Sequence, residues 1–350
     1  MFDYFSGKKN RHEIEVILKT TDVDWDAVVK VSTGHFVFPA LYCNLKRADF
    51  LKYLPTDLVD YMKYITNLNR DRNKQIITQA HELNTLLLNN NITPIFLKGT
   101  GNLLAGIYDD IAERMVGDID FIFSKEDYPK AITVLRDNGY SDASKYKYHF
   151  PSTKHYRRLQ KENNIAAIEI HKELLIEKYT NEFNYSFVEK NSQVLNGVTV
   201  LNYANKLNLS IIANQINDHG FYCKTMALRN AYDVFLLSKK TNAKGAVNSL
   251  DTLNHPLNCF LAACYVIFNK VESLEYNNTK KTAAYLSNFN SQFTNPKATK
   301  KRHKFIKTYL ILIFRINILY KLIRYKKYRI WLLSRLTSLN FYKRRLGIKK

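Results

Sequence analysis

Apolar residues recur at helical spacing through the first quarter of the chain, across residues 12–90. The repeat is clearest in two groups, Leu58, Val59, Met62 and Ile65, and then Ile76, Ile77, Leu83, Leu86 and Leu87. Steps of three and four place the members of each group on one face of a helix. We therefore predict an N-terminal helical segment over residues 1–90.

Short strands replace this pattern after residue 90. A turn leads into a predicted strand over 94–97, the glycine-containing stretch 98–101 (KGTG), and a helix over 102–108. A second strand is predicted over 118–123, where polar and apolar residues alternate before an apolar run. Two strands joined through a short helix indicate a compact α+β unit.

A helix and a hairpin follow this second strand. Ser124 and Asp127 resemble a capping box at the helix start, and Gly139 suits its end. The hairpin has strands over 156–160 and 165–171 around a polar turn. The core predicted from these elements spans residues 91–200.

Helical spacing returns from about residue 205 to residue 290. Its clearest apolar stripe is Leu228, Ala231, Tyr232, Phe235 and Leu236. The predicted fold is α+β, a small mixed sheet flanked by N- and C-terminal helical segments. The predicted divisions are 1–90, 91–200, 201–296 and a basic, aromatic-rich tail over 297–350.

The net charge of +22 resides mainly in that tail. Residues 297–350 hold 18 Lys and Arg and no Asp or Glu, whereas residues 1–296 hold 35 basic and 31 acidic residues. Electrostatic arguments about partners therefore concern the tail. Over residues 305–339 the longest uncharged run, 308–314, is far shorter than the ~20 residues that a spanning helix needs.

The cysteines and the first residues suggest a cytoplasmic location. Cys43, Cys223, Cys259 and Cys264 form no CxxC pair and have no metal-ligand spacing, which fits a reducing compartment. The first 16 residues contain no apolar segment typical of a signal peptide.

Acidic residues on two predicted strands are the candidate chemistry. Asp118 and Asp120 lie two residues apart, so they share a face of their strand, and Glu169 and His171 do so on theirs. Crowded carboxylates repel unless a cation lies between them, and Mg²⁺ prefers carboxylate, water and phosphate oxygens. The alternative is a solvated polar face in each case.

Residues 98–101 could approach a phosphate. A turn between a strand and a helix presents backbone N–H groups and the helix dipole, and glycine allows close approach. The spacing is not that of a Walker A loop. Taken alone, the stretch is only a glycine-containing turn.

The order of these features resembles the nucleotidyltransferase superfamily with the polymerase β-like fold. The superfamily has an hG[GS] turn, an hDhDh strand and a later acidic residue, matched here at Gly99 and Thr100, at Asp118 and Asp120, and at Glu169. Thr100 departs from the second Gly or Ser. The stretch between the turn and the DxD strand is also longer than the superfamily norm.

One subgroup is a closer match over roughly residues 20–240. It consists of uncharacterised bacterial nucleotidyltransferases that are often encoded beside surface-polysaccharide genes. The similarity includes the LKG turn after Ile92, Arg114 ahead of the DID strand, Gly139-Tyr140 and the IEIH strand ending at His171.

The resemblance implies roles for these residues. Asp118, Asp120 and Glu169 would bind Mg²⁺, with Mn²⁺ as an alternative, and Glu169 would help to deprotonate the acceptor. The nucleotide-binding residues would be Lys98, Gly99, Thr100 and Arg114, and His171 and His219 would lie near the pocket. For Arg114 the alternative is an ion pair with Asp109, Asp110 or Glu113, and for Lys98 it is an ordinary surface position.

The expected reaction transfers a nucleoside monophosphate from an NTP to a small hydroxyl or phosphate acceptor, within surface-polysaccharide biosynthesis. Nucleotidylation of a protein, and a non-catalytic membrane- or RNA-binding protein, are the alternatives. For residues 297–350 three interpretations stay open: an anionic membrane surface on the inner face, nucleic acid, or packing on the body. We favour the membrane, by analogy with sugar-polymer assembly. The oligomeric state does not follow from the sequence.

Overall fold

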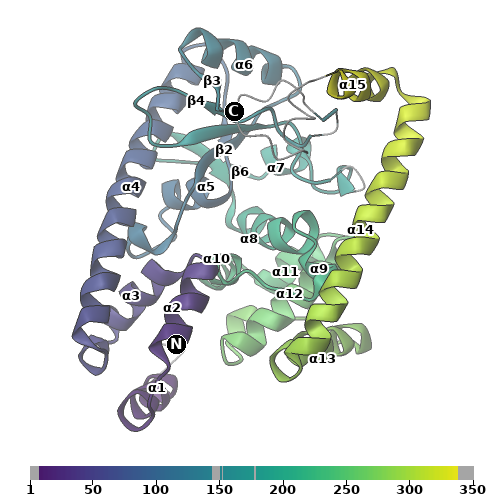
Figure 1. Cartoon of the computed structure of the whole chain (residues 1–350). Helices are drawn as coiled ribbons and strands as arrows, with labels where there is room; N and C mark the ends of the chain where they lie inside the picture. The colour runs from purple at the N-terminus through teal and green to yellow at the C-terminus, as the bar shows by residue number, and fades with distance from the viewer. Residues whose placement is uncertain (1–7, 144–149, 152, 177–178, 338–350) are drawn as a thin grey trace.

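The computed structural model describes residues 8–143, 150–151, 153–176 and 179–337. The chain begins with four helices, as the apolar spacing predicts: α1 (Lys8–Thr20), α2 (Trp25–Gly34), α3 (Phe38–Arg47) and α4 (Thr56–Leu88). Helix α4 has 33 residues and follows Pro55, whose fixed φ suits a helix start. Figure 1 shows it running along one side of the molecule.

A seven-stranded mixed sheet forms the centre, in the order β3-β4-β5-β2-β1-β7-β6. Its strands are β1 (Ile95–Phe96), β2 (Asp118–Ile122), β3 (Ser141–Asp142), β4 (Leu159–Gln160), β5 (Ala167–His171), β6 (Ser192–Leu195) and β7 (Val198–Leu201). The pairs β2–β5 and β1–β7 are parallel, and the remaining pairs are antiparallel. The α+β class with a small mixed sheet is thus confirmed.

The structure corrects two predictions inside the core and adds one hairpin that the sequence analysis did not predict. Helix α5 spans Lys98–Leu104, so the KGTG stretch is its first turn, and the helix predicted over 102–108 was placed too late. The predicted hairpin forms, but its first strand has only two residues in β4. The β6–β7 hairpin was not predicted at all. Its turn residues, Asn196 and Gly197, both have positive φ.

Short helices connect the strands and continue beyond the sheet. They are α6 (Asp127–Asp137), α7 (Tyr185–Glu189), α8 (Tyr203–Ile212), α9 (Gly220–Cys223), α10 (Leu228–Ser238), α11 (Ala243–Asn248), α12 (Asn254–Ile267) and α13 (Lys280–Thr294). The Ser124 hydroxyl accepts a hydrogen bond from the Asp127 N–H, as the capping pattern predicts. Gly139 has φ +88°, as expected of a residue that ends a helix.

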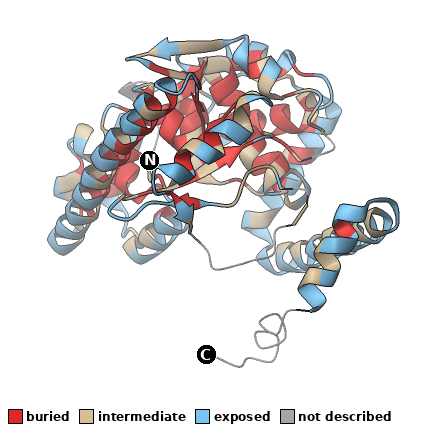
Figure 2. Cartoon of the chain, turned by 90° about the horizontal axis from the view of Figure 1, so that it is seen from above, coloured by how far each residue is buried: buried red, intermediate tan, exposed pale blue. Residues whose placement is uncertain are grey.

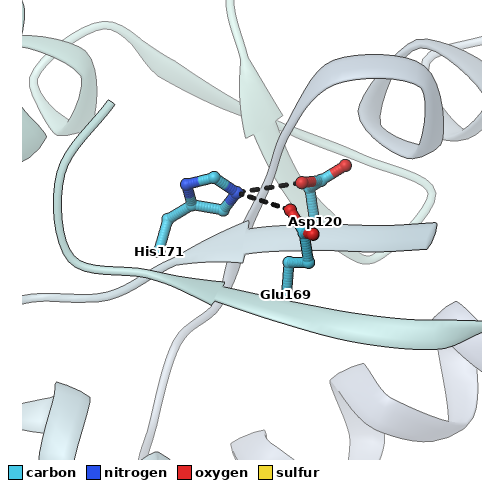
Figure 3. A group of neighbouring side chains, drawn as sticks. All are labelled: Asp120, Glu169 and His171. Carbon is cyan, nitrogen blue, oxygen red and sulfur yellow. Dashed lines mark hydrogen bonds and ion pairs between the residues drawn. The ribbon is translucent and has the colours of Figure 1, made fainter. Parts of the chain in front are cut away.

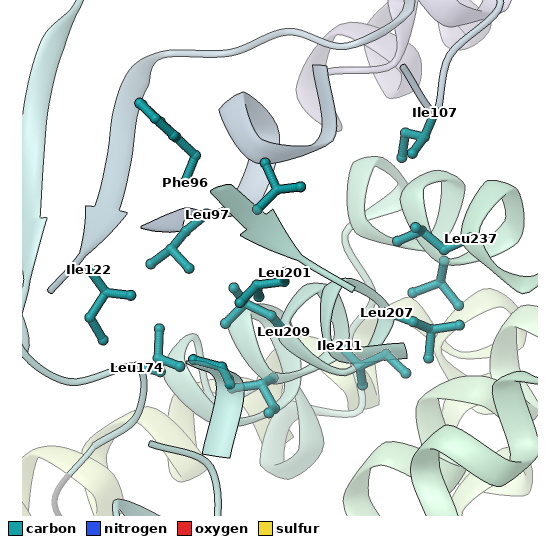
Figure 4. Packing of buried hydrophobic residues seen from close by; sticks show 14 of the residues in the cluster. Phe96, Leu97, Ile107, Ile122, Leu174, Leu201, Leu207, Leu209, Ile211 and Leu237 are labelled. Carbon is teal, nitrogen blue, oxygen red and sulfur yellow. The ribbon is translucent and has the colours of Figure 1, made fainter. Parts of the chain in front are cut away.

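One hydrophobic core joins the sheet to the C-terminal helices. Phe96, Leu97 and Ile122 from the sheet region lie in the same cluster as Leu209 of α8 and Leu237 of α10 (Figure 4). A second, smaller cluster packs α2, α3 and the start of α4 together. The continuous core fixes the position of the C-terminal helices relative to the strands that carry the acidic residues.

The described part of the chain ends in two helices that we call the C-terminal arm, α14 (Pro296–Arg324) and α15 (Lys326–Leu336). The arm runs along the side of the molecule opposite α4 (Figure 1), and most of its residues are exposed (Figure 2). Among the described helices, none is long and apolar enough to cross a membrane.

Candidate active site

The acidic residues meet because β2 and β5 are neighbours in the sheet. These strands are parallel, and their register places Asp120 directly beside Glu169. The alternate residues Ile119 and Ile168 have no exposed surface and point into the core. Asp118, Asp120, Glu169 and His171 therefore share the opposite face, as the two-residue spacing predicts.

Asp120, Glu169 and His171 form the tightest group (Figure 3). The imidazole Nε2 of His171 lies 2.9 Å from Asp120 Oδ1 and 3.6 Å from Glu169 Oε2. One ligand atom from each of the three residues falls within 4.8 Å of the others, a spacing that could hold a metal ion. Asp120 is only 7% exposed, so this group lies beneath the surface.

Lys98 reaches the same group from the first residue of α5. Its ammonium Nζ lies 2.6 Å from Asp120 Oδ1, 3.7 Å from Glu169 Oε2 and 3.3 Å from His171 Nε2. Lys98 has φ +51°, a left-handed conformation that costs a residue with a Cβ roughly 1–2 kcal/mol. From this left-handed backbone conformation the Lys98 side chain points at the Asp120 and Glu169 carboxylates.

Arg158 is a member of the site that the sequence did not reveal. Its Nη2 lies 2.6 Å from Asp118 Oδ2 and 3.1 Å from Glu169 Oε1. Because Leu159 pairs with Ile168 in the antiparallel β4–β5 ladder, Arg158 stands across from Glu169. Asp118 thus joins the group through a shared guanidinium.

Burial and charge act differently on the carboxylates. Burial raises the pKa of Asp118 above its usual range, although Arg158 opposes this effect. Burial would also raise the pKa of Glu169, but the hydrogen bond with His171 and the charge of Lys98 hold it well below its usual range. The nearby Lys154 ammonium has a lowered pKa because of burial and of the charge of Lys98. The site is therefore a cluster of anions enclosed by cations.

Gly99 and Thr100 lie behind the carboxylates and are buried. The Thr100 hydroxyl donates to the Asp118 carbonyl at 3.0 Å, so it holds α5 against the start of β2. A Cβ on Gly99 would lie 3.0 Å from Val116 Cγ2 and 3.5 Å from Arg114 Cζ. Glycine at position 99 lets this turn pack closely on the segment that leads into β2.

Arg114 is buried beneath Gly99 and forms an ion pair with a distant residue. Its Nε lies 3.0 Å from each carboxylate oxygen of Asp233 in α10. The alternative prediction, an ion pair between Arg114 and an acidic residue nearby in sequence, is wrong. Asp110 contacts Arg70, and Glu113 contacts Arg47. Arg114 therefore links the approach to β2 with the C-terminal helices.

His219 lies at the start of α9 with φ +58°. Its ring is 6.4 Å from that of Tyr222, and its Nδ1 is buried without a hydrogen-bond partner in the described part of the chain. The structure brings His171 into contact with the carboxylates and shows no such contact for His219 among the described residues.

The acidic cluster between β2 and β5 is the candidate active site, and the family comparison indicates the class of protein. The chain belongs to the family described as uncharacterised nucleotidyltransferase, whose model matches residues 21–274. No curated protein matches the sequence.

Two solved structures from Helicobacter pylori are similar to this chain. One is JHP933, with 13% identity and a TM-score of 0.30, covering 69% of this chain and 97% of its own. The other is described as a candidate nucleotidyltransferase, with 14% identity and a TM-score of 0.31, covering 69% and 96%. The family assignment rests on the match over residues 21–274.

Proposed function

We propose that this chain transfers a nucleoside monophosphate from an NTP to a small hydroxyl or phosphate acceptor, with the site between β2 and β5 as the reaction centre. The observation that supports this is the pairing of Asp120 with Glu169, with His171 in contact with both. The acceptor oxygen would form a bond to the α-phosphorus. The bond from that phosphorus to the oxygen bridging to the β-phosphate would break, and pyrophosphate would leave.

The residues present fit a divalent cation. Asp120 and Glu169 offer carboxylate oxygens, which suit Mg²⁺ and Mn²⁺, and the His171 nitrogen is more readily accepted by Mn²⁺ than by Mg²⁺. When bound, the cation would supply Lewis-acid polarisation of the phosphate oxygens. Asp118, which contacts Glu169 through Arg158, is the candidate further ligand.

Two cationic side chains hold the carboxylates of the site together. Lys98 contacts Asp120, and Arg158 bridges Asp118 and Glu169. On nucleotide binding, we propose that Lys98 and Arg158 turn from the carboxylates to the phosphate oxygens and neutralise charge that develops on pyrophosphate. Glu169, whose pKa is held low, would be ionised at neutral pH and available as a ligand of the cation.

Gly99 and Thr100 would contribute backbone rather than side chain. The first N–H groups of a helix have no partner within it, so those of residues 99 and 100 in α5 could donate to a phosphate. Arg114 acts here as a positioning residue, because its guanidinium is paired with Asp233 and packs beneath Gly99. The acceptor we propose is a sugar phosphate or a lipid-linked sugar of surface-polysaccharide assembly.

The proposal is tested by incubating the chain and a cell extract with each α-labelled NTP in turn, in the presence of Mg²⁺ or Mn²⁺. We expect label to enter one small-molecule or lipid fraction with the wild-type chain and to be lost at least ~10²-fold with Asp120→Asn, since such charged groups typically contribute several kcal/mol. Asp137→Asn, at an exposed position on α6, is the matched control and should keep full turnover. Retained turnover in Asp120→Asn would overturn the proposal.

A further inference from the structure

The C-terminal arm carries large apolar side chains that remain 44–82% exposed along α14. Along α14 they include Tyr309, Ile311, Leu312, Ile313, Phe314, Ile316, Leu319, Tyr320 and the two most exposed, Phe305 at 73% and Ile323 at 82%. Residues 311–317 are exposed without interruption, which is almost two turns of helix. The apolar surface therefore faces outward on every side of α14, where a helix of such composition is normally buried.

Basic residues flank this apolar centre at both ends. Residues 297–307 hold six Lys and Arg, and residues 321–329 hold five. Between them, residues 308–320 hold a single charge, that of Arg315. Helix α14 is about 44 Å long at 1.5 Å per residue, so the first basic group lies along its start and the second lies at its end and continues into α15.

We propose that the C-terminal arm docks on an anionic lipid surface. Acyl chains would cover the exposed Ile, Leu and Phe side chains, and anionic headgroups would pair with the Lys and Arg side chains, whose long stems can reach outward from an embedded helix. The arm has no Asp or Glu, so its charge is complementary to such a surface over its whole length.

The charge and the exposed aliphatic side chains of the arm argue against two other binding partners, a second copy of this chain and a nucleic acid. A second copy of this chain also carries +22, and two arms packed together would bring like charges into contact. Nucleic acid would match the charge and could stack on the aromatic rings, but its phosphates and sugars do not cover branched aliphatic side chains. An anionic lipid surface both covers aliphatic side chains and carries the complementary negative charge.

The arm is fixed to the body at two places. At its base, Arg302 and His303 donate to the Cys223 carbonyl at 3.0 and 2.8 Å. Near its tip, the ring of Phe150 lies 5.7 Å from Phe314 and 5.2 Å from Trp331. The segment that carries Phe150 continues to Arg158, which contacts the carboxylates, so docking would fix the candidate site relative to the lipid surface. This last step alone rests on the proposed function.

Vesicle co-sedimentation of the full chain without NTP tests the docking independently of turnover. The vesicles are phosphatidylcholine with or without phosphatidylserine. We expect binding only with phosphatidylserine, and roughly 10²-fold weaker binding when Lys300, Lys301 and Lys304 are all changed to Gln, because each basic residue near the surface contributes about fivefold. A second variant, Ile313→Ser with Ile316→Ser, should weaken the binding that remains at high salt.

The matched control changes Lys63, Lys190 and Lys240, exposed on the body, to Gln and should bind as the wild type does. Circular dichroism and sedimentation velocity report whether each variant is folded and monomeric. The proposal is overturned by any of three results: equal loss in the body and arm variants, tighter binding to RNA than to vesicles at equal phosphate and salt, or a lipid-independent oligomer that the arm variants dissociate.

Discussion

The ammonium group of Lys98 lies 2.6 Å from the Asp120 carboxylate, within the group of atoms that could hold a divalent cation. It also lies 3.7 Å from Glu169. Burial would lower the pKa of Lys98, but the charges of Asp120 and Glu169 raise it above its usual value. A protonated lysine and a metal ion therefore compete for the same carboxylates.

The first prediction concerns this competition. Lys98→Met leaves Asp120 without its nearest cation, so we expect a lower melting temperature in the absence of metal and roughly tenfold tighter Mn²⁺ binding. Added Mn²⁺ should restore most of the lost stability, which differential scanning fluorimetry with and without Mn²⁺ measures. A melting temperature that falls equally under both conditions would show that Lys98 has only a structural role.

The second prediction concerns the buried ion pair between Arg114 and Asp233. Arg114→Met leaves the Asp233 carboxylate buried with the Tyr108 hydroxyl as a remaining donor at 2.7 Å. We expect a loss of about 3–5 kcal/mol in the free energy of unfolding, measured by urea denaturation. The double variant Arg114→Met with Asp233→Leu should recover much of this loss, because it removes both charges. A loss under about 1 kcal/mol in the single variant would contradict the assignment, since that is typical of a surface pair.

Lys206 gives the third prediction, a pH dependence of stability. Its Nζ is buried and donates to the Gly101 carbonyl at 3.2 Å, and burial lowers its pKa to about 7. An unfolded lysine titrates at ~10.4, so between about pH 7 and pH 10 the unfolded chain binds more protons than the folded chain. This group therefore makes the fold more stable as pH rises through that window.

Lys206→Met removes the titrating group without shortening the side chain much. We expect a higher free energy of unfolding at pH 7 and a smaller rise towards pH 9, measured by urea denaturation at both values. An unchanged pH slope would show that the Lys206 ammonium is solvated or paired in the folded chain.

The acidic face of the site could be predicted from spacing within the sequence. Asp118 and Asp120 on one strand, and Glu169 and His171 on another, need only the two-residue period of a strand to share a face. The family resemblance implied that the three carboxylates act together, and the β2–β5 pairing in the structure brings Asp120 beside Glu169.

Residues that act across long sequence separations could not be predicted in this way. The partner of Arg114 is Asp233, 119 residues away. The hairpin predicted from the sequence has a four-residue turn after Gln160, a register that would pair residue 158 with residue 167. In the structure Leu159 pairs with Ile168 instead, and this register places Arg158 opposite Glu169. The β6–β7 hairpin, by contrast, was available from the sequence, because Asn196-Gly197 is a strong signal for a two-residue turn.

The most direct measurement of the central claim is Mn²⁺ binding, followed by electron paramagnetic resonance with a non-hydrolysable NTP analogue present. We expect the wild type and the Asp137→Asn control to bind Mn²⁺ equally, and Asp120→Asn and Glu169→Gln to bind it at least ~10-fold more weakly, since each removes a proposed ligand. If both of these variants hold Mn²⁺ as the wild type does, the paired carboxylates of β2 and β5 are not a metal site and the account is contradicted.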